Sequence, residues 1–319
     1  MRAGDPVELL AAARDGNRGA IARLISYVER GGDQASVVSR LTWSAARTAN
    51  LIGMTGAPGA GKSTLTNALV SHIRTTTGDR VGVLAIDPSS PFTNGAILGD
   101  RVRMQDHATD DGVFIRSMAT RGHIGGLALA TPEAARVLAA VGYPTVIIET
   151  VGVGQVEVEI AGAADTTVVV VNPGWGDAVQ ANKAGLLEVA DVFVINKADR
   201  PGVAEVRRDL EAMLDMHTSP GPWRPPIVET VAARGEGAVE LWGAIEKHRA
   251  HMNETGELER RQAKRAAAEV REIITRTIER GAVEALRSEA GAALCARVTS
   301  GEIDPHAAAE KILKEMPHG

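Results

Sequence analysis

The chain has 319 residues, of which 44% are hydrophobic and 24% are charged, enough for one sizeable core with smaller attachments. Its formal net charge of −5, without a long basic run, argues against a nucleic-acid partner. The single cysteine, Cys295, has no partner for an intramolecular disulfide, which fits a reducing compartment. Charged residues interrupt every apolar run near the N-terminus, so we expect a cytoplasmic protein with no secretory signal and no membrane contact.

Residues 1–45 are expected to form an N-terminal helical extension. The segment DPVELLAAAR begins with Asp5 as a plausible N-cap and Pro6 at the first helical position. The tripeptide DGN at 15–17 is typical of a turn. A second helix is predicted over 20–30, because apolar side chains recur there at helical spacing: Ile21, Leu24, Ile25 and Val28.

Residues 46–250 alternate short β-branched runs with helical stretches. Seven runs are predicted as strands: 51–55, 81–86, 113–118, 145–150, 166–172, 191–196 and 226–230. Near-continuous apolar strands separated by helices indicate an α/β domain with a mostly parallel sheet buried on both faces. Right-handed crossovers place the polar loops that follow these strands at one edge, where such sheets bind ligands.

Residues 251–319 are expected to be helical again and to form a C-terminal arm. The segment 254–289 is rich in charge, and one apolar face is marked by Val270, Ile273, Ile274, Thr277 and Ile278.

The segment GAPGAGKSTL follows the first predicted strand and matches the P-loop pattern. Its glycines allow backbone N–H groups to turn inward around phosphates, and the next helix adds its positive N-terminal end. Lys62 can reach the β- and γ-phosphates, and the Ser63 hydroxyl can ligate Mg²⁺. The predicted phosphate-binding residues are Gly56, Ala57, Pro58, Gly59, Ala60, Gly61, Lys62, Ser63 and Thr64.

The tetrapeptide NKAD at 196–199 follows a predicted strand and favours guanine as the base. The Asp199 carboxylate can accept hydrogen bonds from N1–H and the exocyclic amine of guanine, donors that adenine lacks in that arrangement. Asn196 can bond the base and brace the P-loop, and the Lys197 stem can pack on the ring. Val231 and Ala232, in the stretch TVAARGEG, are expected to offer backbone N–H groups under the base.

Candidate catalytic and switch residues follow other predicted strands. Glu149 stands at the end of a buried strand and can hold an Mg²⁺-bound water, while the Gly152 N–H can bond the γ-phosphate. Gln155 can orient the attacking water, although a solvated glutamine is the alternative. Asp87 and Asp100 can approach the metal and the nucleotide, although a loop aspartate is more often a cap or turn residue.

Five segments together resemble the MeaB/ArgK (MMAA-type) family of P-loop GTPases: GAPGAGKSTL, AIDPSSPFTNGAILGDRVRM, RSMATRGHIGGLA, IIETVGVGQVEVEIAGAAD and NKAD. These are chaperones of adenosylcobalamin-dependent methylmalonyl-CoA mutase. The resemblance covers most of residues 50–200, and the flanking helical regions suit the family's N-terminal extension and C-terminal dimerisation arm.

The resemblance implies a homodimeric GTPase that binds GTP or GDP with Mg²⁺, gates adenosylcobalamin loading and protects the mutase. Asp87 and Asp100 match the family's switch I aspartates, so the implied metal residues are Ser63, Asp87, Asp100 and Glu149. Asp177 and Lys183 match the charged members of an additional switch loop. No arginine finger is evident in the sequence, so we expect slow intrinsic hydrolysis that a partner stimulates.

Two other functions remain open from the sequence. A kinase acting on a periplasmic amino-acid transport protein is implied by the ArgK name, and Asp87 could serve as its base. A nickel-delivering GTPase would need Cys or His clusters. The sequence has one cysteine and scattered histidines, with His123 the histidine of most interest.

Overall fold

The computed structural model describes residues 4–47, 49–87, 107, 109–119, 124–150, 162–174, 189–216 and 222–315. These residues form two compact units, Met1–Arg265 and Ala266–Gly319. The larger unit holds the sheet and every described residue of the predicted site. We propose that the chain has the three functional regions expected from the sequence, 1–45, 46–250 and 251–319.

The N-terminal region is helical, with α1 (Pro6–Arg14), α2 (Arg18–Arg30), α3 (Asp33–Thr42) and a 3-10 turn, η1 (Trp43–Arg47). Asp5 caps α1 as expected, because its side chain accepts a hydrogen bond from the Val7 backbone N–H. Asn17 caps α2 in the same way by accepting from the Ala20 N–H. Local polar residues thus fix where both helices start.

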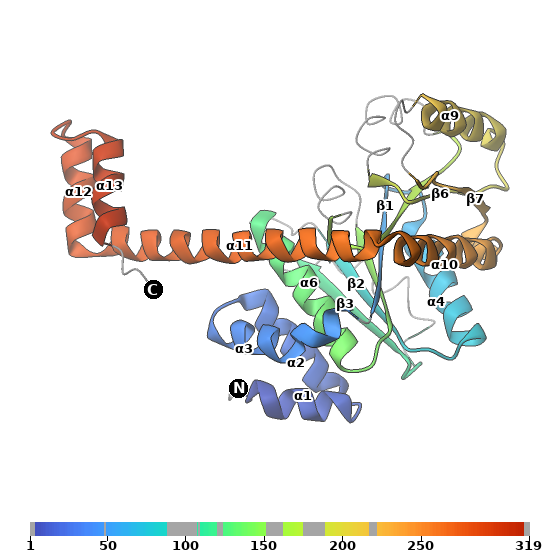
Figure 1. Ribbon diagram of the computed structural model, residues 1–319, viewed down its shortest axis with the longest axis horizontal. Helices are drawn as coiled ribbons and strands as arrows, with labels where there is room; N and C mark the ends of the chain where they lie inside the picture. Colours follow the sequence, from blue (N-terminus) through green and yellow to red (C-terminus); the bar gives the residue numbers. More distant parts are fainter. Residues whose placement is uncertain are drawn as a thin grey trace. The chain divides into compact units, whose positions relative to one another are not determined.

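One seven-stranded sheet forms the centre of the larger unit (Figure 1). Its strand order is β3-β2-β4-β1-β5-β6-β7. Its strands are β1 (Asn50–Gly56), β2 (Val81–Asp87), β3 (Val113–Ala119), β4 (Thr145–Thr150), β5 (Thr166–Val171), β6 (Val192–Asn196) and β7 (Ile227–Thr230). Every pairing is parallel. The predicted α/β fold is therefore confirmed, and all seven strand ends reach one edge.

Helices cover both faces of the sheet. Helices α4 (Lys62–Thr76) and α10 (Ala238–Thr255) pack on one face, where Leu65 and Leu241 join side chains such as Val168. On the other face, α6 (Ile124–Ala140) lies against β2, β3 and β4, and α9 (Val203–Asp215) lies against β5 and β6. Val168 and Val169 are neighbours in β5, so their side chains point to opposite faces of the sheet. Both side chains are buried, so helices cover both faces, as the continuous apolar strands predict.

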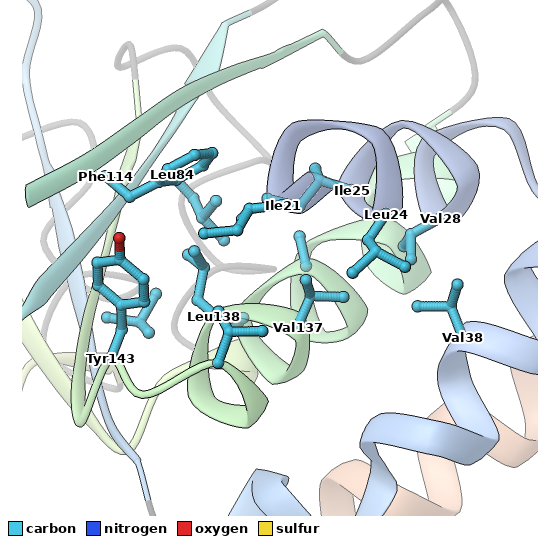
Figure 2. Packing of buried hydrophobic residues seen from close by; sticks show 14 of the residues in the cluster. Ile21, Leu24, Ile25, Val28, Val38, Leu84, Phe114, Val137, Leu138 and Tyr143 are labelled. Carbon is cyan, nitrogen blue, oxygen red and sulfur yellow. The ribbon is translucent and has the colours of Figure 1, made fainter. Parts of the chain in front are cut away.

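The N-terminal helices share their core with the sheet rather than forming a separate one. Ile21 of α2 packs in one cluster with Leu84 and Phe114 of the strands and with Leu138 of α6 (Figure 2). Arg116 of β3 reinforces this contact by pairing with Glu29 at 2.6 Å. Helices α1–α3 therefore support the β3 side of the sheet.

The C-terminal helices are α11 (Glu257–Arg287), α12 (Glu289–Thr299) and α13 (Pro305–Glu315). No side chain of α11 is buried. Four of the predicted apolar positions, Val270, Ile273, Ile274 and Ile278, are between 45% and 56% exposed. The smaller unit thus presents an apolar stripe of its own.

Candidate functional site

The candidate site lies where the strands end. β1 occupies the middle of the sheet, with β4 on one side and β5, β6 and β7 on the other. Glu149 pairs with Met54 two residues before the end of β1, and Asn196 ends β6 two strands away. The predicted metal-side carboxylate and the predicted base-reading residues therefore flank the glycine-rich loop from opposite sides.

The loop between β1 and α4 has the backbone geometry of a tight cradle. Gly61 is left-handed, with φ of +93°, and α4 begins at the next residue. A Cβ on Gly61 would lie 2.3 Å from the Asn196 side-chain nitrogen, so both the backbone angle and the available space require glycine. The loop thus ends on a helix N-terminus, the arrangement that favours bound phosphate.

Lys62 and Ser63, the first residues of α4, are both buried at this edge. The Lys62 ammonium donates to the backbone oxygens of Gly56 (2.6 Å) and Ala57 (3.0 Å), so it lies inside the loop. The Ser63 hydroxyl donates to the Glu149 carboxylate at 2.5 Å, which joins the loop to β4. A cation, a hydroxyl and a carboxylate are therefore gathered at the start of one helix.

These oxygen atoms suit Mg²⁺, which prefers oxygen ligands from one or two carboxylates and keeps several waters. Ser63 and Glu149 supply a hydroxyl and a carboxylate in direct contact, both nearly excluded from solvent. The Asp87 backbone ends β2, the strand next to β4. No group of three or more His, Cys, Asp or Glu side chains forms a metal site within the described ranges.

Asn196 and Lys197 connect the end of β6 to the glycine-rich loop. The Asn196 amide donates to the Ala60 oxygen at 2.8 Å, and the Lys197 ammonium donates to the Gly59 oxygen at 2.6 Å. Among the described residues, Lys197 is the one non-glycine residue with positive φ, at +59°. Such a conformation is uncommon for a residue with a side chain. Asp199, in the turn that follows, is exposed.

The stretch after β7 closes over the same turn. Val231 and Ala232 are both buried, and Ala232 starts a 3-10 turn, η3 (Ala232–Arg234). The Val231 N–H already donates to the Glu236 oxygen, and the Ala232 N–H donates to the Asn196 side-chain oxygen. Both predicted N–H donors therefore lie at the expected loop but serve to shape it.

Thr230, the last residue of β7, begins the predicted loop TVAARGEG but was not among the residues expected to have a role in the site. Its hydroxyl donates to the Asn196 side chain, and its backbone oxygen accepts from the Ala198 N–H. The register of β6 and β7, which places Thr230 opposite Asn196, was the missing information. Five predicted residues, Asp100, Gly152, Gln155, Asp177 and Lys183, lie outside the described residues.

A second buried polar cluster lies at the opposite edge, where β5 and β6 begin. His248 lies between the Thr166 hydroxyl (2.9 Å) and the Asp191 carboxylate (3.2 Å). Burial tends to raise the pKa of Asp191, but hydrogen bonds from His248 and Arg261 outweigh it and hold the pKa below its ordinary value. This hydroxyl, imidazole and carboxylate are nearly excluded from solvent, and through His248 they join the starts of β5 and β6 to α10.

Comparisons with known proteins agree with this geometry. Residues 21–287 match the profile of the family described as methylmalonyl Co-A mutase-associated GTPase MeaB. A candidate GTPase of Pyrococcus abyssi is 48% identical over 98% of this chain and 97% of its own. GTPase ArgK of Escherichia coli is 37% identical over 79% of this chain and 78% of its own.

The fold is also similar to a solved structure, the crystal structure of an LAO/AO transport system kinase. That structure has a TM-score of 0.70 and 26% identity, covering 97% of this chain and 96% of its own. Within the part of the chain that the structure describes, no helix combines the length and hydropathy needed to cross a membrane.

Proposed function

Because the chain belongs to the MeaB family of P-loop GTPases, we propose that it is a GTP-dependent chaperone of methylmalonyl-CoA mutase. In this proposal its nucleotide state gates the loading of adenosylcobalamin into the mutase and helps to protect the enzyme. The description of the family supports the association with the mutase. The nucleotide chemistry is supported by the site itself.

The observation that carries the proposal is the bracing of one glycine-rich loop from both sides. Ser63 of the loop helix contacts Glu149, while Asn196 and Lys197 hold the carbonyl groups of Ala60 and Gly59. The proposed phosphate-binding and base-reading elements are thereby joined at one edge of the sheet. An ATP-binding loop would have no need of Asp199, whose carboxylate complements the two donors on guanine.

Each residue has a distinct role in the proposed hydrolysis. Lys62 leaves its backbone oxygens to bind the β- and γ-phosphates, where its charge stabilises the transferring phosphoryl group. Ser63 and Glu149 would hold Mg²⁺, with Asp87 and Asp100 as further candidates. When bound, that ion would neutralise charge on the phosphates. Gln155 and Gly152 are proposed to orient water and to sense the γ-phosphate.

The partner is proposed to act on the switch segments. With no arginine finger recognisable in the sequence, intrinsic hydrolysis is expected to be slow, and mutase binding is expected to accelerate it. Asp177 and Lys183 are the proposed charged contacts of the additional switch loop. Coupling between nucleotide and mutase must be reciprocal in binding, so the GTP and GDP states must differ in affinity for the mutase.

The proposed active form is a homodimer in which residues 251–319 provide the dimerisation arm. The exposed stripe of Val270, Ile273, Ile274 and Ile278 supports this role. Several large apolar side chains exposed together on one helix are typical of a surface that binds another protein chain. Analytical ultracentrifugation of the whole chain tests it. A monomer at micromolar concentration would contradict the proposed dimer.

The proposed function is tested by loading apo-mutase with adenosylcobalamin, followed by the change in the cofactor's absorbance. We expect loading to depend on whether GTP, a non-hydrolysable GTP analogue or GDP is present, and Lys62→Ala to remove that dependence. Loading that ignores the nucleotide would contradict the proposal.

A kinase remains the alternative function, since the solved structure of similar fold carries that description. Incubation with γ-labelled GTP or ATP and a periplasmic amino-acid-binding protein tests it. Label on the acceptor protein would favour the kinase, whereas label released only as phosphate supports the GTPase.

A further inference from the structure

We propose that Thr230 is a positioning residue that joins base recognition to the phosphate loop. Thr230 begins the stretch TVAARGEG, which was predicted to pack under the base, but the sequence assigned it no role of its own. Its side chain acts through Asn196 rather than on nucleotide. The inference rests on the proposed guanine-nucleotide binding, and it adds a residue that should control affinity for the phosphates and the base together.

The Asn196 amide has one orientation that satisfies its neighbours. The Ala232 N–H can only donate, and it lies 3.1 Å from the atom assigned as the amide oxygen. The Ala60 backbone oxygen can only accept, and it lies 2.8 Å from the amide nitrogen. These two fixed partners assign the oxygen and nitrogen without ambiguity.

Thr230 strengthens this orientation from the neighbouring strand. Its hydroxyl donates to the Asn196 side-chain oxygen at 3.1 Å, so that oxygen accepts two hydrogen bonds. The Thr230 backbone oxygen also accepts from the Ala198 N–H at 3.0 Å. One residue therefore holds both the side chain of Asn196 and the backbone of the turn that leads to Asp199.

The rotamer of Thr230 is itself constrained by burial. Thr230 is only 1% exposed. Gly237, with φ of +83°, passes so close that an added Cβ would lie 2.8 Å from the Thr230 methyl group and 2.4 Å from the Glu229 oxygen. The loop can approach this closely only as glycine, and water has no access to replace the hydroxyl. Without the hydroxyl, the Asn196 side-chain oxygen would lose one of its two hydrogen-bond donors at a site that water does not reach.

A continuous path of hydrogen bonds follows from these contacts, running from Thr230 through the Asn196 amide to the Ala60 oxygen of the phosphate loop. Asp199 stands on the turn that the same residue holds. Removing the hydroxyl should therefore weaken binding of a ligand that has phosphates but no base. Removing the Asp199 carboxylate should not do so.

The experiment compares Thr230→Val, Thr230→Ser and Asp199→Asn by isothermal titration with Mg²⁺·GTP and with Mg²⁺·tripolyphosphate, which lacks a base. Thr230→Val is expected to lower the affinity for both ligands roughly three- to tenfold, which is the effect of losing one buried hydrogen bond. Thr230→Ser retains the hydroxyl and should restore both affinities. Asp199→Asn should weaken GTP and leave tripolyphosphate unchanged.

Thr42→Val is the matched control, because Thr42 is equally buried and, among the described residues, its hydroxyl bonds to Val38 and Ser39 of its own helix. It should change neither affinity. If Thr230→Val does not fold, Thr230→Ala removes the hydroxyl together with the methyl group and is compared with Thr230→Ser, which removes the methyl group alone. Unchanged affinities, or a loss confined to GTP, would overturn the link to the phosphate loop. Failure of the unaltered protein to bind GTP would instead refute the proposed function.

Discussion

Replacing Arg261 with methionine is expected to destabilise the larger unit through the cluster at the start of β5 and β6. The Arg261 guanidinium donates to both Asp191 oxygens, at 2.8 and 2.9 Å, and to the Asp165 backbone oxygen at 3.0 Å. Methionine retains much of the stem and the helix propensity but makes none of these bonds. Among the described residues, the buried Asp191 carboxylate would then keep His248 and the Thr167 N–H as its partners.

The magnitude follows from the burial of the two partners. Removing one partner of a fully buried ion pair costs about 3–5 kcal/mol. The Arg261 side chain is 32% exposed, so water can partly replace it and the cost should be lower. We expect a loss of about 2 kcal/mol in the free energy of unfolding. Arg260→Met is the matched control, since the Arg260 side chain is 64% exposed and pairs with Glu257 on the surface.

Urea denaturation of the two variants, followed by circular dichroism, measures the difference directly. Arg260→Met should lie within ~0.5 kcal/mol of the unaltered protein. The pKa of Asp191 is held low in the folded state, so its ionised form stabilises the fold above the ordinary pKa of aspartate. That contribution is lost as pH falls below about 4, so the cost of Arg261→Met should shrink there. Equal stability of the two variants at pH 7 would refute the reasoning.

Three further substitutions test the nucleotide site. Lys62→Ala should abolish tight GTP binding, measured by titration calorimetry, because the Lys62 ammonium is proposed to contact the phosphates. Retained affinity would contradict the assignment of this loop as the phosphate-binding site. Asp199→Asn should relax the preference for GTP over xanthosine triphosphate in competition binding, and unchanged selectivity would refute base reading by that carboxylate. Gly61→Ala should weaken GTP binding at least as much as Thr230→Val, because the added methyl group meets the Asn196 side chain 2.3 Å away. Normal GTP affinity in this variant would contradict the described loop geometry.

The sheet could be predicted closely because its signals are local. All seven strands were expected within a residue or two, since β-branched apolar runs mark them and several of these runs end beside Gly, Pro, Asn or Asp. The P-loop was equally clear, because its glycines, Lys62 and Ser63 form one continuous segment. The Asp5 cap and Pro6 marked the start of α1 for the same reason.

The contacts that need strand order could not be predicted. The register that places Thr230 opposite Asn196 depends on the pairing of β6 with β7, whose residues lie more than 30 positions apart. The same holds for Arg261 and Asp191, which meet because α11 begins beside the start of β6. No short pattern in the sequence identifies such pairs, and the N-terminal helices likewise share the sheet's core without a local signal.

The most direct test of the central claim is GTP hydrolysis by the purified protein, with and without the methylmalonyl-CoA mutase of the same organism, and with ATP as control. We expect slow turnover of GTP alone and a clear acceleration when the mutase is added. GTP turnover that is indifferent to the mutase would contradict the proposed partner. A preference for ATP would contradict the reading of Asn196 to Asp199 and favour the kinase.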